Sequence, residues 1–267
     1  MKRISLRQIA NIIGLVATLV FNFVSQDTRL VENTNADIAN RYPILYFPAN
    51  AAFSIWGIIY TLLIAWVIYQ ALPSQRDNPN QQRIGWLFVV TCIANIAWLV
   101  SFQFLEQFAL SMIAMLALLG TLIAIYLRLD IGRAAVSLRD RLLIHVPFSV
   151  YLGWITAATV TNATYVLYDA GYTQSFLGIS AETWAVILFV VSALLALAAV
   201  ITRRDVAYAL VIVWALYFIG VRWQELETVG ISAYVAAGVS LLAAAAGLAF
   251  MFIRNNNDQT GMRQRTA

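Results

Sequence analysis

The sequence predicts an all-α fold, a polytopic membrane helix bundle of about eight transmembrane helices. Hydrophobic residues make up 61% of the 267 residues and charged residues only 11%, whereas a soluble domain has about 25% charged residues. The apolar residues also fall into eight separate runs. Most of these runs reach the roughly 20 residues that a helix needs to cross about 30 Å of hydrocarbon.

The first run covers about residues 9–25 and follows three basic residues, Lys2, Arg3 and Arg7. A cleaved signal peptide would look similar, but the run ends without a small-residue cleavage site. We therefore predict a retained helix, with a cleaved leader as the alternative. The polar connection 26–48 follows and ends in an aromatic cluster.

The remaining runs are each expected to form one membrane-crossing helix. The shortest of them, 206–221, is the least certain span. The polar tail 254–267 is predicted to be disordered and cytoplasmic. The runs cover residues 50–71, 85–105, 108–127, 143–165, 183–201, 206–221 and 229–253.

The distribution of positive charge predicts the orientation in the membrane. Eight helices place both termini on one side, and that side holds 14 of the 17 Lys and Arg residues, while Arg29, Arg41 and Arg222 fall on the other. Cytoplasmic loops are enriched in Lys and Arg. We therefore predict an integral protein of a bacterial plasma (inner) membrane with both termini cytoplasmic. The excess of positive charge then describes topology and implies no nucleic-acid partner.

Several classes of function lack the residues that they need. The single histidine, His145, excludes a multi-histidine metal or haem site, and the single cysteine, Cys92, excludes an intramolecular disulfide. No Asp, Glu, Lys or Arg lies near the centre of a predicted span. Intramembrane carboxylates are the usual mark of ion coupling, so an ion-coupled carrier is disfavoured, although broken helices can bind ions through backbone carbonyls. We predict no metal site.

The polar residues inside the spans are concentrated in two helices, the third and the fifth. In the run 143–165, residues at three- and four-residue steps share one helical stripe: Pro147, Tyr151, Trp154, Ala158, Asn162 and Tyr165. Asn95, Trp98 and Phe102 share a face of the third span, and Trp56 and Tyr60 lie one turn apart in the second. The predicted orientation puts these groups at similar depth, with the connection 26–48 above them as a lid. They form either a ligand pocket or hydrogen-bonded contacts between helices.

Three short patterns resemble those of the TspO/MBR family, the tryptophan-rich sensory proteins and the translocator protein. The segment Trp154-Ile-Thr-Ala-Ala-Thr-Val-Thr-Asn162 is similar to the family's fifth-helix signature Trp-x-Thr-x-Ala-Thr-x-x-Asn. Asn95-Ile-Ala-Trp98 followed by Phe102 resembles the third-helix pattern. Trp56-Gly-Ile-Ile-Tyr60, preceded by Pro48 and Phe53, resembles the second-helix pattern.

The resemblance implies a TspO-like five-helix domain over residues 1–168, here followed by an additional three-helix region over 169–253. It implies a pocket between the second, third and fifth helices, under the first outer loop, for a porphyrin or another flat apolar ligand. It also suggests a homodimer and no required cofactor. The cholesterol pattern is missing, because no Lys or Arg follows Tyr165. Carried over by motif, the ligand-binding candidates are Trp56, Tyr60, Asn95, Trp98, Phe102, Trp154, Ala158 and Asn162.

Three functions remain open from the sequence. The protein binds, senses or transports a tetrapyrrole-like hydrophobic ligand, or it is a carrier for another small metabolite, or it is a light-dependent porphyrin-degrading enzyme. No acid–base pair or nucleophile with an adjacent base is visible. We therefore expect a non-enzymatic protein without catalytic residues.

Overall fold

The computed structural model describes the backbone of residues 4–265 and the side chains of residues 4–250. The predicted disordered tail, 254–267, lies beyond the described side chains, so that prediction stays untested. The long helices are α1 (Leu6–Val24), α3 (Ile55–Ala71), α5 (Leu87–Leu99), α6 (Phe108–Arg128), α8 (Val146–Asp169), α9 (Ala181–Arg203), α10 (Val206–Arg222) and α11 (Glu227–Arg265).

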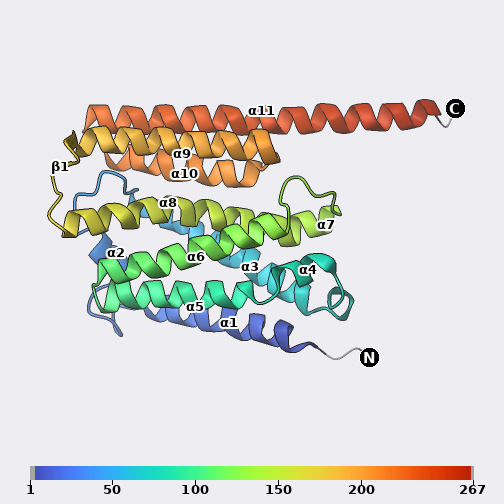
Figure 1. The fold of residues 1–267 in the computed structure, drawn as a ribbon, viewed down its shortest axis with the longest axis horizontal. Helices are drawn as coiled ribbons and strands as arrows, with labels where there is room; N and C mark the ends of the chain where they lie inside the picture. Colours follow the sequence, from blue (N-terminus) through green and yellow to red (C-terminus); the bar gives the residue numbers. More distant parts are fainter. Residues whose placement is uncertain (1–3, 266–267) are drawn as a thin grey trace.

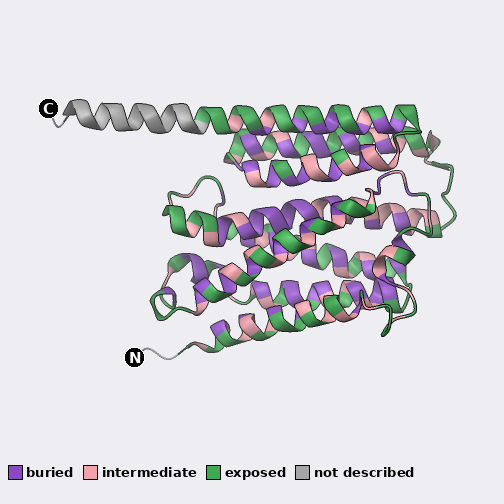
Figure 2. Cartoon of the chain, turned by 180° about the vertical axis from the view of Figure 1, so that it is seen from behind, coloured by how far each residue is buried: buried purple, intermediate pink, exposed green. Residues whose placement is uncertain are grey.

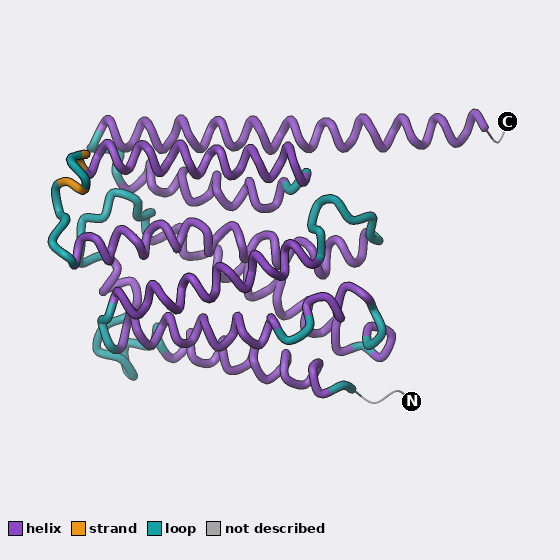
Figure 3. Tube along the Cα trace, in the orientation of Figure 1, coloured by secondary structure: helices purple, strands orange, loops and turns teal. Residues whose placement is uncertain are grey.

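Short elements connect or extend these helices. They are the helices α2 (Asn35–Ala39), α4 (Pro79–Ile84) and α7 (Leu138–Asp140), the 3-10 turns η1 (Asn50–Ser54) and η2 (Pro73–Gln75), the π-helical turns η3 (Val100–Phe104) and η4 (Arg141–His145), and the strands β1 (Ser175–Phe176) and β2 (Ile179–Ser180). Strands β1 and β2 pair antiparallel as a small hairpin between α8 and α9 (Figure 3).

The described part of the chain contains seven helical segments that are long and apolar enough to span a membrane, and α10 is a shorter eighth apolar helix. This confirms the predicted all-α polytopic bundle. Helices α1, α3, α5, α6 and α8 form one group, and α9, α10 and α11 stack beside α8 (Figure 1). Both ends of the chain lie at the same end of the bundle, as an even number of spans requires. That this end is cytoplasmic remains a prediction.

Helix α8 lies at the centre of the bundle. In the apolar 18-residue stretch of the segment Leu138–Asp169, 72% of the residues are buried, compared with 22–50% in the corresponding stretches of the other six segments. Helices α1 and α11 instead present largely exposed outer faces (Figure 2). The central position explains why α8 can carry so many hydroxyl and amide groups, because neighbouring helices and not lipid surround them.

Two π-helical turns interrupt the α-helical pattern, one after α5 and one before α8. Turn η4 ends just before Pro147, which has no backbone N–H to donate to the preceding turn, and such interruptions of the α-helical ladder commonly take a π-helical form. Turn η3 follows α5 and carries Phe102 and Gln103. The Gln103 Nε2 donates to the backbone oxygens of Ser25 (2.8 Å) and Asn33 (2.9 Å). Turn η3 therefore anchors the start of the connection that leads into α2.

Two contacts between α8 and α10 help to join the last three helices to the first five. Asp205 caps the N-terminus of α10 through the Tyr208 N–H, and its carboxylate also accepts from the Ser149 hydroxyl of α8 at 2.7 and 2.6 Å. Nearer the middle of α8, a Cβ on Gly153 would lie 3.0 Å from Val211 Cβ. The missing side chain at Gly153 thus lets α8 and α10 approach closely, as small residues do between membrane helices.

Candidate functional site

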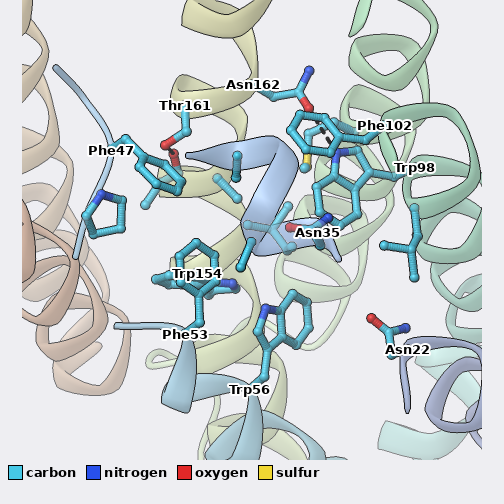
Figure 4. Close-up of a pocket in the computed structure, with 18 of the residues that line it drawn as sticks. Asn22, Asn35, Phe47, Phe53, Trp56, Trp98, Phe102, Trp154, Thr161 and Asn162 are labelled. Carbon is cyan, nitrogen blue, oxygen red and sulfur yellow. Dashed lines mark hydrogen bonds between the residues drawn. The ribbon is translucent and has the colours of Figure 1, made fainter. Parts of the chain in front are cut away.

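A cavity of about 560 Å³ lies between the helices at the end of the bundle that carries α2. All eight residues predicted as ligand-binding candidates line it: Trp56, Tyr60, Asn95, Trp98, Phe102, Trp154, Ala158 and Asn162. They come from α3, α5, η3 and α8, as the sequence predicted, and Figure 4 shows several of them facing one space. A volume of this size is typical of small-molecule sites, which span roughly 300–1,000 Å³.

Two stacked aromatic pairs form much of the cavity wall. The rings of Trp56 and Tyr60 are stacked with centroids 5.2 Å apart, and those of Trp98 and Phe102 with centroids 5.4 Å apart. Trp154 meets Trp56 edge to face at 6.5 Å. Stacked and edge-to-face pairs hold aromatic rings in fixed orientations. The cavity therefore presents large rigid apolar faces.

The Asn162 side chain forms contacts within the protein. Its Oδ1 accepts from the Trp98 indole N–H at 2.8 Å, and its Nδ2 donates to Ser111 Oγ at 3.1 Å. The side chain is only 3% exposed. Asn162 thus links α8 to α5 and α6 and fixes the Trp98 ring. Its amide is therefore hydrogen-bonded within the protein.

Asn95 is occupied in the same way. Its Oδ1 accepts from Asn22 Nδ2 of α1 at 2.9 Å, and its Nδ2 donates to the Tyr151 hydroxyl at 3.4 Å. The sequence left open whether the two asparagines orient a ligand or connect helices. Their hydrogen bonds show that both amides connect helices, and that they line the cavity as parts of its wall.

The connection 26–48 covers the cavity, and α2 is its centre. Thr34 and Asp37 form a reciprocal capping box at the start of α2, and the hydrogen bonds from Thr34 hold the pKa of Asp37 below its ordinary value. At the end of α2, the Tyr165 hydroxyl donates to the Ala39 backbone oxygen, and Arg41 pairs with Glu106 at 2.5 Å. The predicted lid therefore has a defined structure with contacts at both ends.

Helix α10 contributes to the site, which the sequence patterns did not predict. Ala215 and Ile219 line the cavity. The Trp214 indole N–H donates to the Ala52 backbone oxygen at 2.9 Å, and the Ala49 N–H donates to the Phe218 backbone oxygen at 2.9 Å. These bonds hold η1, which leads directly into Trp56. Asn22, Asn35, Phe47, Phe53 and Thr161 are further lining residues outside the predicted set.

We expect the substitution Trp214→Phe to lower the free energy of unfolding by about 1 kcal/mol, because it removes one net hydrogen bond from a partly buried site. It should also loosen η1 and change the fluorescence of the neighbouring Trp56. Thermal unfolding in detergent measures the first effect. Tyr217→Phe, on the half-exposed side of α10, is the matched control and should have almost no effect. Equal effects of the two substitutions would contradict the anchoring role.

The chemistry that the cavity offers is aromatic and neutral polar. No Asp, Glu, Lys, Arg or His is among its described lining residues, and no group of three His, Cys, Asp or Glu in the described chain could hold a metal ion. The lining residues therefore supply no acid–base pair with an ordinary titration range. They are suited to bind a molecule by stacking, burial and a few hydrogen bonds.

Comparison with protein families gives one match, to the family model described as TSPO-like protein, over residues 8–246. This range extends well beyond residue 168 and includes α9, α10 and about half of α11. Comparisons with curated proteins and with solved structures give no match.

Proposed function

Because this chain belongs to the family of TSPO-like proteins, we propose that it binds a tetrapyrrole-like hydrophobic ligand in the cavity between α3, α5 and α8, beneath α2. The single observation that carries this proposal is the convergence of all eight motif-derived residues on one aromatic cavity. The bilayer surrounds the protein. An apolar ligand dissolves in that bilayer and is therefore concentrated around the protein.

The physical fit rests on shape and on apolar area. A flat macrocycle gains about 25 cal/mol for each Å² of apolar surface removed from water, and stacking on indole rings adds to this. Trp56, Trp98 and Trp154 provide such rings from three different helices. Because no charged side chain lines the cavity, the carboxylates of a porphyrin would remain at its mouth, near the exposed Gln26 and Asn50.

Sensing, transport and light-dependent degradation all begin with this binding step. The cavity lining favours binding over acid–base catalysis, because its described residues include no carboxylate, imidazole or amine. We therefore propose a binding protein that senses or transports its ligand, and binding is the step to test first.

Titration of the purified protein with protoporphyrin should quench tryptophan fluorescence in a saturable way. Ala158→Phe places a ring inside the cavity, so we expect it to weaken binding at least tenfold, which corresponds to about 1.4 kcal/mol. Trp56→Phe and Trp154→Phe should reduce both the quenching and the affinity, because each removes a stacking surface.

Two substitutions outside the cavity serve as controls. Ala198→Phe adds the same ring on an exposed position of α9, and Trp86→Phe removes an exposed indole at the start of α5. Neither should change the affinity. Absence of saturable quenching in the unsubstituted protein, or equal weakening by Ala158→Phe and Ala198→Phe, would refute the proposed site.

A further inference from the structure

Asn35 is the first residue of α2 and lines the cavity from the lid side. Its Nδ2 atom is buried and donates to no acceptor in the described part of the chain. Among the described residues that line the cavity, it is the only one with a fully covered side-chain nitrogen or oxygen that lacks a hydrogen-bond partner. The other amides that line deep parts of the cavity, those of Asn22, Asn95 and Asn162, are hydrogen-bonded to one another or to neighbouring helices.

The backbone holds the Asn35 side chain in a defined position. The capping box of Thr34 and Asp37 fixes the first turn of α2 around it, and Gln103 donates to the backbone oxygen of Asn33, two residues before Asn35. In the view of Figure 4, the Asn35 amide projects between Trp98 and Trp56. The amide thus lies beside the space that the aromatic walls enclose, and its Nδ2 atom is covered by the surrounding atoms.

A buried donor without an acceptor carries an energetic penalty that a suitable ligand atom removes. An ionic partner is not favoured here, because the described lining residues include no charge that would support one. The polar group that best complements this site is a neutral acceptor on an otherwise apolar molecule.

We propose that Asn35 donates a hydrogen bond from Nδ2 to a neutral acceptor, a carbonyl oxygen or an unprotonated ring nitrogen, at the edge of the bound ligand. This inference rests on the proposed function and specifies it further. The aromatic walls select flat apolar molecules, and Asn35 selects among them those with an acceptor at the lid side.

Two tricyclic probes of the same shape test this inference. Anthraquinone carries two carbonyl acceptors, whereas anthracene carries none. The dissociation constant of each is measured with the full-length protein in detergent, from tryptophan quenching for anthraquinone and from probe fluorescence for anthracene. The substitution Asn35→Ala removes the donor but leaves the Thr34–Asp37 capping box, and alanine is a good helix former.

We expect Asn35→Ala to weaken anthraquinone binding roughly three- to tenfold, the range for one hydrogen bond at a buried donor. Anthracene binding should stay unchanged, which also shows that the variant is folded. Asn33→Ala, two residues earlier and outside the cavity lining, is the matched control and should leave both constants unchanged.

The outcomes separate the inference from the proposed function. If both probes weaken equally in Asn35→Ala, Asn35 has a structural role and the inference is wrong, although the cavity still binds flat ligands. The inference is also wrong if Asn35→Ala changes neither dissociation constant, or if the unsubstituted protein binds neither tricycle. If protoporphyrin and both tricycles all fail to bind, the proposed function itself is wrong.

Discussion

The substitution Gly132→Ala is expected to lower the free energy of unfolding by about 2–5 kcal/mol. Gly132 has φ +82°, and a Cβ at this position would lie 1.7 Å from the Arg203 backbone oxygen. A left-handed conformation costs an L-residue about 1–2 kcal/mol, and forcing atoms into a filled space adds about 1–3 kcal/mol. Thermal unfolding in detergent micelles measures the loss.

The position of Gly132 gives this loss a specific structural consequence. The α6–α7 loop packs on the C-terminal end of α9, where Arg133 Nε donates to the Thr202 backbone oxygen at 2.9 Å and Arg203 pairs with Asp130 at 3.2 Å. Alanine at Gly132 would push this loop away from α9. We therefore expect α9 to separate locally from the first five helices, and limited proteolysis should cleave the loop 129–137 faster.

Gly171→Ala is the matched control. Gly171 also has a positive φ, +93°, but no atom lies within 4 Å of a Cβ placed there. Its substitution should therefore lower the free energy of unfolding only by the cost of the left-handed backbone conformation, about 1–2 kcal/mol. The loop 129–137 should not be cleaved faster. If both substitutions cost the same, the contact with Arg203 does not contribute.

The fold could be predicted from the sequence because lipid imposes a simple rule. A membrane helix must be long and apolar, so each apolar run identified one helix, including the short run that forms α10 (Val206–Arg222). The π-helical turns could not be predicted from hydrophobicity. They depend on local hydrogen bonding, which the hydrophobic pattern does not report.

The grouping of these residues around one cavity could be predicted because they repeat at helical spacing on three helices at one depth. That reasoning brought Trp56, Trp98 and Trp154 to one cavity. It could not assign the asparagine hydrogen bonds, which depend on partners such as Asn22 and Ser111 that carry no recognisable pattern. Asn35 and the wall residues of α10 were missed for the same reason, since tertiary packing alone brings them to the cavity.

The substitution Asn162→Leu is expected to be the second most damaging, with a loss of about 1–4 kcal/mol in the free energy of unfolding. Leucine has a similar size but leaves the Trp98 indole N–H and the Ser111 hydroxyl without the partner that each has at 2.8 and 3.1 Å. Each hydrogen bond between membrane helices contributes about 0.6–2 kcal/mol, and a buried group left unpaired adds to the loss. Thermal unfolding of the ligand-free protein measures it.

Thr121→Val is the control for this substitution. Thr121 is half-buried on α6, and its hydroxyl donates to the Ala117 backbone oxygen of its own helix. Its substitution should therefore change the free energy of unfolding by no more than about 0.5 kcal/mol. If Asn162→Leu also lowers the free energy of unfolding by no more than about 0.5 kcal/mol, Asn162 does not hold the helices together.

A double-mutant cycle identifies the partner of Asn162. Trp98→Phe removes the indole donor, so Asn162→Leu in that background should cost less than it does alone, by the energy of the Trp98–Asn162 bond. An equal cost in both backgrounds would contradict a direct bond. Because the cycle is measured without ligand, any coupling belongs to the protein itself. Asn162 would then act on ligand binding through the orientation of the Trp98 ring, and its motif position would reflect the building of the aromatic wall.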